Sequence, residues 1–373
     1  MKTLSYYYEN LTPLTNLLKY VNKDDILYFD IETTGLSRKN NHIYLIGCGY
    51  YSDGGLNIIQ WFAENEQEEV KILNEFASFA SSFLCLVNYN GQTFDIPFTT
   101  TRMEKYGLKM PSLDSLDIYT LVKPLKRILS LSDITQKSIE QFLGIKRDDK
   151  FNGGELISVY KKYTHSPSED ALHNLLLHNK EDVLNMHYLT DILDYTVIFD
   201  SMVTYSDHEI KEYVDYNGCK KTELIINGTH KQSSLPHGFN TFKNEGNGSY
   251  IMNFRNDGTL SIRVPVINDT LYYYLDNYKD YYYLPIEDMC ILKSMGGGVL
   301  KENRVNCTKE TCRIKHDSQF IPFIQSKDDA SCDVKLFRGT YKSKENFVRL
   351  VDFENFEINY KNIYVNHLFK FFI

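Results

Sequence analysis

The chain has 373 residues and a formal net charge of −8, with 42% hydrophobic and 24% charged residues. At roughly 100–200 residues per domain this length predicts two domains, and the composition excludes a disordered chain. No stretch approaches the roughly 18 apolar residues that span a bilayer, and the N-terminus lacks the features of a signal peptide. We therefore expect a cytoplasmic protein without a membrane partner. Its seven cysteines predict reduced thiols, because an odd count does not fit a disulfide framework.

The first half alternates predicted strands and helices. The predicted strands lie at 26–32, 42–51, 56–63 and 84–90. The predicted helices lie at 11–20, 66–83, 135–144, 154–163 and 166–193, with one more that begins near Pro97. The Ser-Asp-Gly-Gly segment at 52–55 predicts a hairpin, and the order of elements predicts an α/β domain with a mixed sheet.

The second half changes character near residue 200. Alternating residues on both sides of Asn256-Asp257-Gly258 predict a hairpin, and aromatic runs at 269–275 and 281–284 are typical of strands. A further strand is expected at 347–353. We therefore expect one domain over residues 1–199, with its core at about 24–195, and a β-rich α+β domain over residues 200–373.

Two acidic residues interrupt the first apolar strand of the α/β domain. Asp30 and Glu32 stand two residues apart, so both carboxylates project from one face of the strand. Burial of these carboxylates is costly without a partner, and Mg²⁺ or Mn²⁺ is a natural one. The alternative is an edge strand with a solvated acidic face, which is the usual setting of an isolated Asp-x-Glu pair.

Two more aspartates complete a set of four. Asp95 follows the fourth predicted strand at a strand-to-helix junction, where functional residues often collect, although it could also cap the helix. Asp182 lies on the last predicted helix with His178 four residues earlier, on the same face. The pair could equally be solvated, and spacing alone does not separate it from the competing pair of His187 and Asp191.

Three segments, ILYFDIETTGL, LVNYNGQTFDIPF and HNKEDVLNMHYL, resemble in this order the three exonuclease motifs of the DEDD superfamily. Over about residues 24–195 the chain is similar to the YprB-type ribonuclease H-like family of bacteria. The resemblance implies a ribonuclease H-like mixed β-sheet flanked by helices. It also implies a 3′–5′ exonuclease that hydrolyses phosphodiester bonds of DNA or RNA, most readily at single-stranded 3′ ends, with two divalent cations, Mg²⁺ or Mn²⁺.

The resemblance also assigns roles to residues. It makes Asp30, Glu32, Asp95 and Asp182 the metal ligands, with Asp30 bridging both ions. It makes His178 the candidate that orients or deprotonates the attacking water. The common subclasses have a histidine five residues, or a tyrosine four residues, before the last aspartate. His178 stands at the tyrosine spacing, so a structural role remains the alternative.

The remaining candidates concern nucleic acid. The resemblance implies substrate contacts by Thr33, Thr34, Gly35 and Asn90. In the second domain, tyrosines at 272–274 and 281–283 could stack on bases near Lys293, Lys301 and Arg304, but alternating tyrosines in strands usually pack a sheet face. Two other functions stay open: a nucleic-acid-binding module without activity, and an endonuclease on the same fold.

Overall fold

The structure is a computed structural model that describes residues 1–200, 202–231, 235–246, 248–324 and 334–373. These residues form two compact units. The first comprises Met1–Arg127 and Leu131–Ile198, and the second comprises Ile128–Ser130 and Phe199–Ile373. Within the described parts of the chain, no helix has the length and apolar character needed to cross a membrane.

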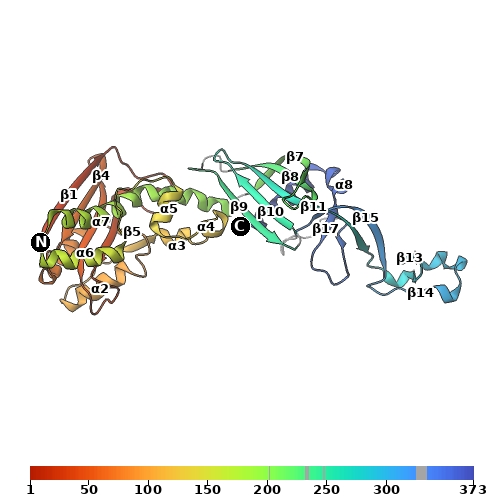
Figure 1. The fold of residues 1–373 in the computed structure, drawn as a ribbon, viewed down its shortest axis with the longest axis horizontal. Helices are drawn as coiled ribbons and strands as arrows, with labels where there is room; N and C mark the ends of the chain where they lie inside the picture. Colours follow the sequence, from red (N-terminus) through yellow and green to blue (C-terminus); the bar gives the residue numbers. More distant parts are fainter. Residues whose placement is uncertain (201, 232–234, 247, 325–333) are drawn as a thin grey trace. The chain divides into compact units, whose positions relative to one another are not determined.

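The first unit is built on a six-stranded sheet with the order β1-β4-β3-β2-β5-β6 (Figure 1). Its strands are β1 (Lys2–Glu9), β2 (Ile26–Thr33), β3 (Ile43–Ser52), β4 (Gly55–Phe62), β5 (Cys85–Asn88) and β6 (Asp114–Asp117). Strand β2 runs antiparallel to β3 and parallel to β5, which confirms the predicted mixed sheet. The predicted hairpin joins β3 to β4. Its tight turn is of type I′, since Asp53 and Gly54 both adopt the positive φ angles that this turn requires.

Helices flank this sheet. They are α1 (Glu69–Ala80), α2 (Asp95–Lys105), α3 (Ile118–Val122), α4 (Leu125–Ile128), α5 (Gln136–Phe142), α6 (Gly153–His165) and α7 (Glu169–Leu189), and a 3₁₀ segment follows α7 over Thr190–Asp200. Helix α7 begins three residues later than predicted, since Ser168 accepts a hydrogen bond from the Ala171 amide whereas Ser166 ends α6. The helix expected at 11–20 is wrong, because only Leu17–Lys19 forms a 3₁₀ turn there. Strand β1 was not predicted.

Alternation along β2 separates the two faces of the sheet. Leu27, Phe29 and Ile31 pack into a core with residues of α1 and α2. The intervening residues face the other side, where α7 packs against β2, β3 and β4 beside α6 (Figure 1). On β3, Gly47 provides the room that α7 needs, since a Cβ atom there would lie 2.2 Å from Asn179 Oδ1. The period of the strand therefore places Asp30 and Glu32 under α7.

The second unit is β-rich, as predicted. Its larger sheet has eight strands: β7 (Val203–Val214), β8 (Lys220–His230), β9 (Phe239–Glu245), β10 (Gly248–Phe254), β11 (Thr259–Tyr274), β15 (Arg313–Pro322), β16 (Phe337–Arg338) and β17 (Phe347–Arg349). A smaller sheet contains β12 (Tyr281–Leu284), β13 (Met289–Leu292) and β14 (Val305–Asn306). The helices are α8 (Leu350–Glu354) and α9 (Ile358–Phe372), and α9 packs against β7 (Figure 1).

Two predicted strands of this half have different bounds. The run at 269–275 is the continuation of β11, which also forms the second strand of the predicted hairpin with β10. The run at 347–353 is a strand only as far as Arg349 and then becomes α8.

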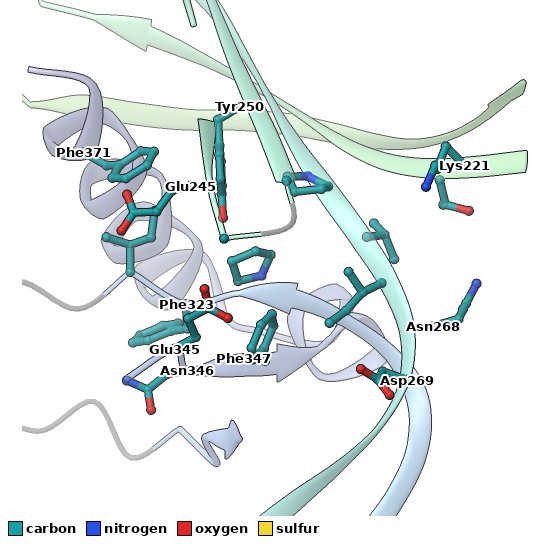
Figure 2. Close-up of a pocket in the computed structure, with 18 of the residues that line it drawn as sticks. Lys221, Glu245, Tyr250, Asn268, Asp269, Phe323, Glu345, Asn346, Phe347 and Phe371 are labelled. Atoms are coloured by element: carbon teal, nitrogen blue, oxygen red, sulfur yellow. The ribbon is translucent and has the colours of Figure 1, made fainter. Parts of the chain in front are cut away.

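The second unit contains a cavity of about 640 Å³. Figure 2 shows the rings of Tyr250, Phe323 and Phe347 around it, together with the carboxylates of Glu245 and Glu345. Lysines and acidic residues both line this space, so its charge does not select one class of ligand.

Candidate metal centre

Strand β2 supplies two of the four predicted acidic residues. It lies between β3 and β5 in the middle of the sheet, which excludes the solvated edge strand that the sequence left open. Glu32 is only 7% exposed, and the side chain of Asp30 accepts a hydrogen bond from Asn179 Nδ2 at 2.7 Å. Glu32 is therefore buried, and Asp30 half-buried, against α7 in the middle of the sheet.

Asp95 is the first residue of α2, directly after the turn that leaves β5. Its Oδ1 accepts a hydrogen bond from the Ile31 amide at 3.2 Å, so it is attached to β2 between the two acidic residues of that strand. Asn90 makes this approach possible by adopting a left-handed φ of 62° in the turn.

Helix α7 carries His178 and Asp182 to the same place. The imidazole Nε2 lies 3.3 Å from Asp182 Oδ2 and 3.6 Å from Glu32 Oε1. Among the residues that the structure describes, Glu32, His178 and Asp182 form a group whose ligand atoms all lie within 4.8 Å of one another. Two carboxylates and an imidazole at this separation fit a divalent cation in their donor chemistry.

The competing pair on α7 lies elsewhere. His187 is buried, and its Nδ1 is hydrogen-bonded to Tyr51 OH at 2.8 Å. Burial lowers the pKa of His187 to about 4, so the ring is neutral near pH 7. His187 therefore packs in the core between α7 and the sheet. Of the two histidines, His178 is the one that lies among the acidic residues.

A loop between α5 and α6 supplies charged residues that sequence analysis missed. Asp149 Oδ2 lies 2.7 Å from His178 Nδ1, and Arg147 Nη1 lies 2.7 Å from Asp182 Oδ1 and 2.9 Å from Glu140 Oε1. The amides of residues 148 and 149 donate to Glu181, which attaches the loop to α7. The charged run KRDD at 146–149 was the only signal for these contacts in the sequence, and its spacing did not connect it to α7.

A buried amide holds Asp30 in place. Asn179 Nδ2 donates to Asp30 Oδ2, and Asn179 Oδ1 accepts from Gln60 Nε2 at 2.7 Å. Asn179 can lie there because the facing residue of β3 is Gly47, which pairs with Asp30 in the sheet. Asn179 thus connects α7 to Asp30 on β2.

The electrostatics show how crowded these carboxylates are. Burial, followed by the charges of Asp182, Asp95 and Glu32, holds the pKa of Asp30 well above its usual range. Burial also raises the pKa of Glu32 to about 8 and that of Asp95 to about 7. Such a group is stabilised by protons or by cations, and a divalent ion relieves the repulsion most directly.

His178 experiences the same field in the opposite sense. Burial lowers its pKa, but the negative charges of Asp182, Glu32 and Asp149 outweigh this and raise the pKa above its usual value. The carboxylates of Asp182 and Glu32, which would bind a cation, therefore also favour the protonated form of the His178 ring.

The predicted substrate contacts lie at the end of β2 and in the turn after β5. Thr33 Oγ1 donates to the Gly35 carbonyl, and the Thr34 amide donates to the His42 carbonyl. The Thr34 amide is thus engaged within the protein, and a substrate contact by Thr34 stays a prediction. The Asn90 amide likewise donates to Asp117 Oδ1, while its side chain accepts from Thr93 Oγ1.

The aromatic candidates of the second unit are half-buried. Arg304 lies 4.7 Å from the centre of the Tyr282 ring and donates to the Gly296 carbonyl, and Lys293 lies 5.5 Å from the same ring. Arg304 is thus engaged within its own unit, which favours the packing role of these tyrosines over base stacking.

Comparison with known proteins shows what the first unit is similar to. Residues 27–194 match the model of the RNase_H superfamily. Over 172 residues, 45% of this chain and 41% of the relative, the sequence is 28% identical to the uncharacterized protein YprB of Bacillus subtilis (strain 168). The chain thus spans about two fifths of the length of that curated relative.

Solved structures show more distant likenesses. One is the family B DNA polymerase from the archaeon Pyrobaculum calidifontis, with a TM-score of 0.37 and 16% identity over 47% of this chain and 26% of the polymerase. Another is Brucella melitensis NrnC bound to pGG, with a TM-score of 0.33 and 17% identity over 50% of this chain and 79% of NrnC. At these scores the likenesses do not bear on function. The family match and the sheet order together show that residues 27–194 have a ribonuclease H-like fold, and the sequence of this domain is similar to that of YprB.

Proposed function

We propose that the chain is a metal-dependent nuclease, and that it acts as a 3′–5′ exonuclease of the DEDD type on DNA or RNA. The observation that carries the proposal is the convergence of Glu32, His178 and Asp182 within 4.8 Å, beside half-buried Asp30 and buried Asp95. Four acidic residues from β2, α2 and α7 meet here, although burial penalises the charge of Asp30, Glu32 and Asp95. A cation site accounts for this cost better than packing does.

The four acidic residues would hold two divalent cations, Mg²⁺ or Mn²⁺. When bound, such ions activate a water molecule and stabilise the oxygen that leaves a phosphodiester. Asn179 would keep Asp30 oriented, and the Ile31 amide would do the same for Asp95. The terminal nucleotide would lie at the ends of the strands beside the acidic residues. It would contact Thr33, Gly35 and Asn90 there, together with the side chain of Thr34.

The test is digestion of 5′-labelled single-stranded DNA and RNA by the full chain with Mg²⁺ or with Mn²⁺. We expect products that shorten from the 3′ end and that disappear in Asp30→Asn and Asp182→Asn. The fluorescence of Trp61, the one tryptophan of the chain, reports whether each variant is folded. Well-folded wild type that cleaves neither polymer with either metal would refute the proposal and favour a binding module.

A blocked 3′ end separates an exonuclease from an endonuclease. An exonuclease stalls on such a substrate, whereas an endonuclease cuts it internally. Internal products from the blocked strand would retain the nuclease proposal but overturn its 3′–5′ polarity.

A further inference from the structure

We propose that His178 is itself a metal ligand: its Nε2 atom joins Glu32 and Asp182 in a site that prefers a transition-metal dication such as Mn²⁺ to Mg²⁺, and Asp149 positions the ring. The inference rests on the proposed function for the presence of a cation, but not for the reaction. It gives His178 a different role from the water-activating base that the family resemblance implies.

The first step concerns the proton on the ring. Asp149 Oδ2 lies 2.7 Å from His178 Nδ1 and also accepts from Lys137 Nζ at 2.9 Å, while Asp149 Oδ1 accepts from the Phe151 amide. Asp149 is surrounded by donors and its side chain is only 1% exposed, so it is an ionised acceptor. Nδ1 of the histidine must therefore carry a hydrogen, which leaves the lone pair of the neutral ring on Nε2.

The second step concerns what Nε2 faces. It lies 3.3 Å from Asp182 Oδ2 and 3.6 Å from Glu32 Oε1, and both atoms are acceptors when ionised. Three electron-rich atoms this close repel one another unless a proton or a cation lies among them. The guanidinium of Arg147 does not serve, because it binds the other carboxylate oxygen, Asp182 Oδ1.

The third step concerns the pattern as a whole. A histidine that coordinates a metal through one nitrogen commonly donates its other N–H to a carboxylate, which fixes the ring and raises its basicity. Asp149 and His178 have this arrangement, with Nε2 directed at two carboxylates. Separations of 3.3–3.6 Å are also too short for a separate water molecule to lie between Nε2 and these oxygens.

The nitrogen donor determines which cation is preferred. Mg²⁺ favours an all-oxygen shell, whereas first-row transition-metal dications accept an imidazole nitrogen more readily, and Mn²⁺ is the one among them that also suits carboxylates. The structure therefore suggests that one position of the centre discriminates between the two ions that the acidic residues alone would accept.

The experiment uses the full chain loaded with Mn²⁺ and pulsed electron paramagnetic resonance, which detects ¹⁴N coupled to the ion. We expect a ¹⁴N coupling from a directly bound imidazole in wild type, its loss in His178→Gln, and its retention in His173→Gln. His173 is an exposed histidine of the same helix and serves as the matched control. Calorimetry should show that His178→Gln weakens Mn²⁺ binding about tenfold or more but Mg²⁺ binding about threefold or less.

Asp149→Asn tests the positioning role. It keeps an acceptor for Nδ1 but removes the charge, and we expect Mn²⁺ affinity to fall about tenfold while the ¹⁴N coupling persists. The fluorescence of Trp61 checks that each variant is folded.

The outcomes separate this inference from the proposed function. Bound Mn²⁺ without ¹⁴N coupling, together with nuclease activity, overturns the inference and leaves the function standing. A coupling that depends on His178 without any cleavage supports the inference and overturns the function. Absence of Mn²⁺ binding to folded wild type overturns the inference, and digestion with Mg²⁺ then decides the function.

Discussion

Replacement of Asp95 by asparagine should stabilise the metal-free protein at the expense of metal binding. Burial raises the pKa of Asp95 from 3.8 to about 7, and the amide keeps an acceptor for the Ile31 N–H. One pKa unit corresponds to 1.36 kcal/mol, so the ionised carboxylate costs the folded state up to about 4 kcal/mol above pH 7. A raised pKa means that the folded state holds its proton more tightly. The contribution of Asp95 to stability is therefore complete below its unfolded pKa and is lost as pH rises through about 7.

Urea unfolding of the metal-free chain, followed through the fluorescence of Trp61, measures this effect because that residue is buried in the first unit. The advantage of Asp95→Asn over wild type should grow by about 3 kcal/mol between pH 5 and pH 8. His187, whose pKa burial lowers to about 4, makes every variant less stable as pH falls from about 6.5. For this reason only the difference between variant and wild type isolates Asp95.

Asp114→Asn is the matched control, because Asp114 is an exposed aspartate of the neighbouring strand β6. It should change stability by less than about 0.5 kcal/mol at either pH. The reasoning is refuted if Asp95→Asn is no more stable than wild type at pH 8, or if its advantage in stability shrinks as pH rises. Either result would show that the ionised carboxylate of Asp95 does not destabilise the folded metal-free protein.

Three further predictions concern packing and metal binding. Gly47→Ala should lower stability by about 1–3 kcal/mol through overpacking and should weaken Mn²⁺ binding, because the new methyl group displaces Asn179. Gly153→Ala, in open space at the start of α6, is the control and should change neither stability nor Mn²⁺ binding. Equal effects of the two variants in calorimetry would contradict the role of Gly47 in making room for Asn179. Arg102→Met should cost about 3–5 kcal/mol in urea unfolding, since it leaves Glu69 charged and fully buried, and a loss below about 1 kcal/mol would argue against a buried ion pair. Mn²⁺ at 100 times its Kd should stabilise the first unit by about 2.7 kcal/mol. The affinity for Mn²⁺ should be higher at pH 8 than at pH 6, because protons compete with the ion for carboxylates whose pKa values are raised. Equal affinity at both pH values would contradict this competition.

Much of the first unit could be predicted from local pattern. Strand β2 and helix α7 follow from their hydrophobic period, and alternation alone put Asp30 and Glu32 on one face. Strand β1 was missed because Lys2–Glu9 lies half-exposed at the sheet edge, where its stability comes from pairing with β4 and not from an apolar run. The second unit was predicted only as a class, since β11 combines two segments that look separate in the sequence.

The sequence by itself determined the order of the four acidic residues, the strand and helix that carry three of them, and the resemblance that suggested their chemistry. Spacing did not decide which histidine of α7 joins them, because His178 and His187 stand equally far from an aspartate. The resemblance pointed to His178, and the tertiary structure places its ring beside Asp182 while His187 bonds to Tyr51. It also decided the partner of that histidine. Asp149 lies 29 residues away in a loop, and its contact depends on how the loop folds back onto α7. Short-range periodicity records which face a side chain occupies, whereas a contact between a loop and a helix is set by the packing of the whole domain.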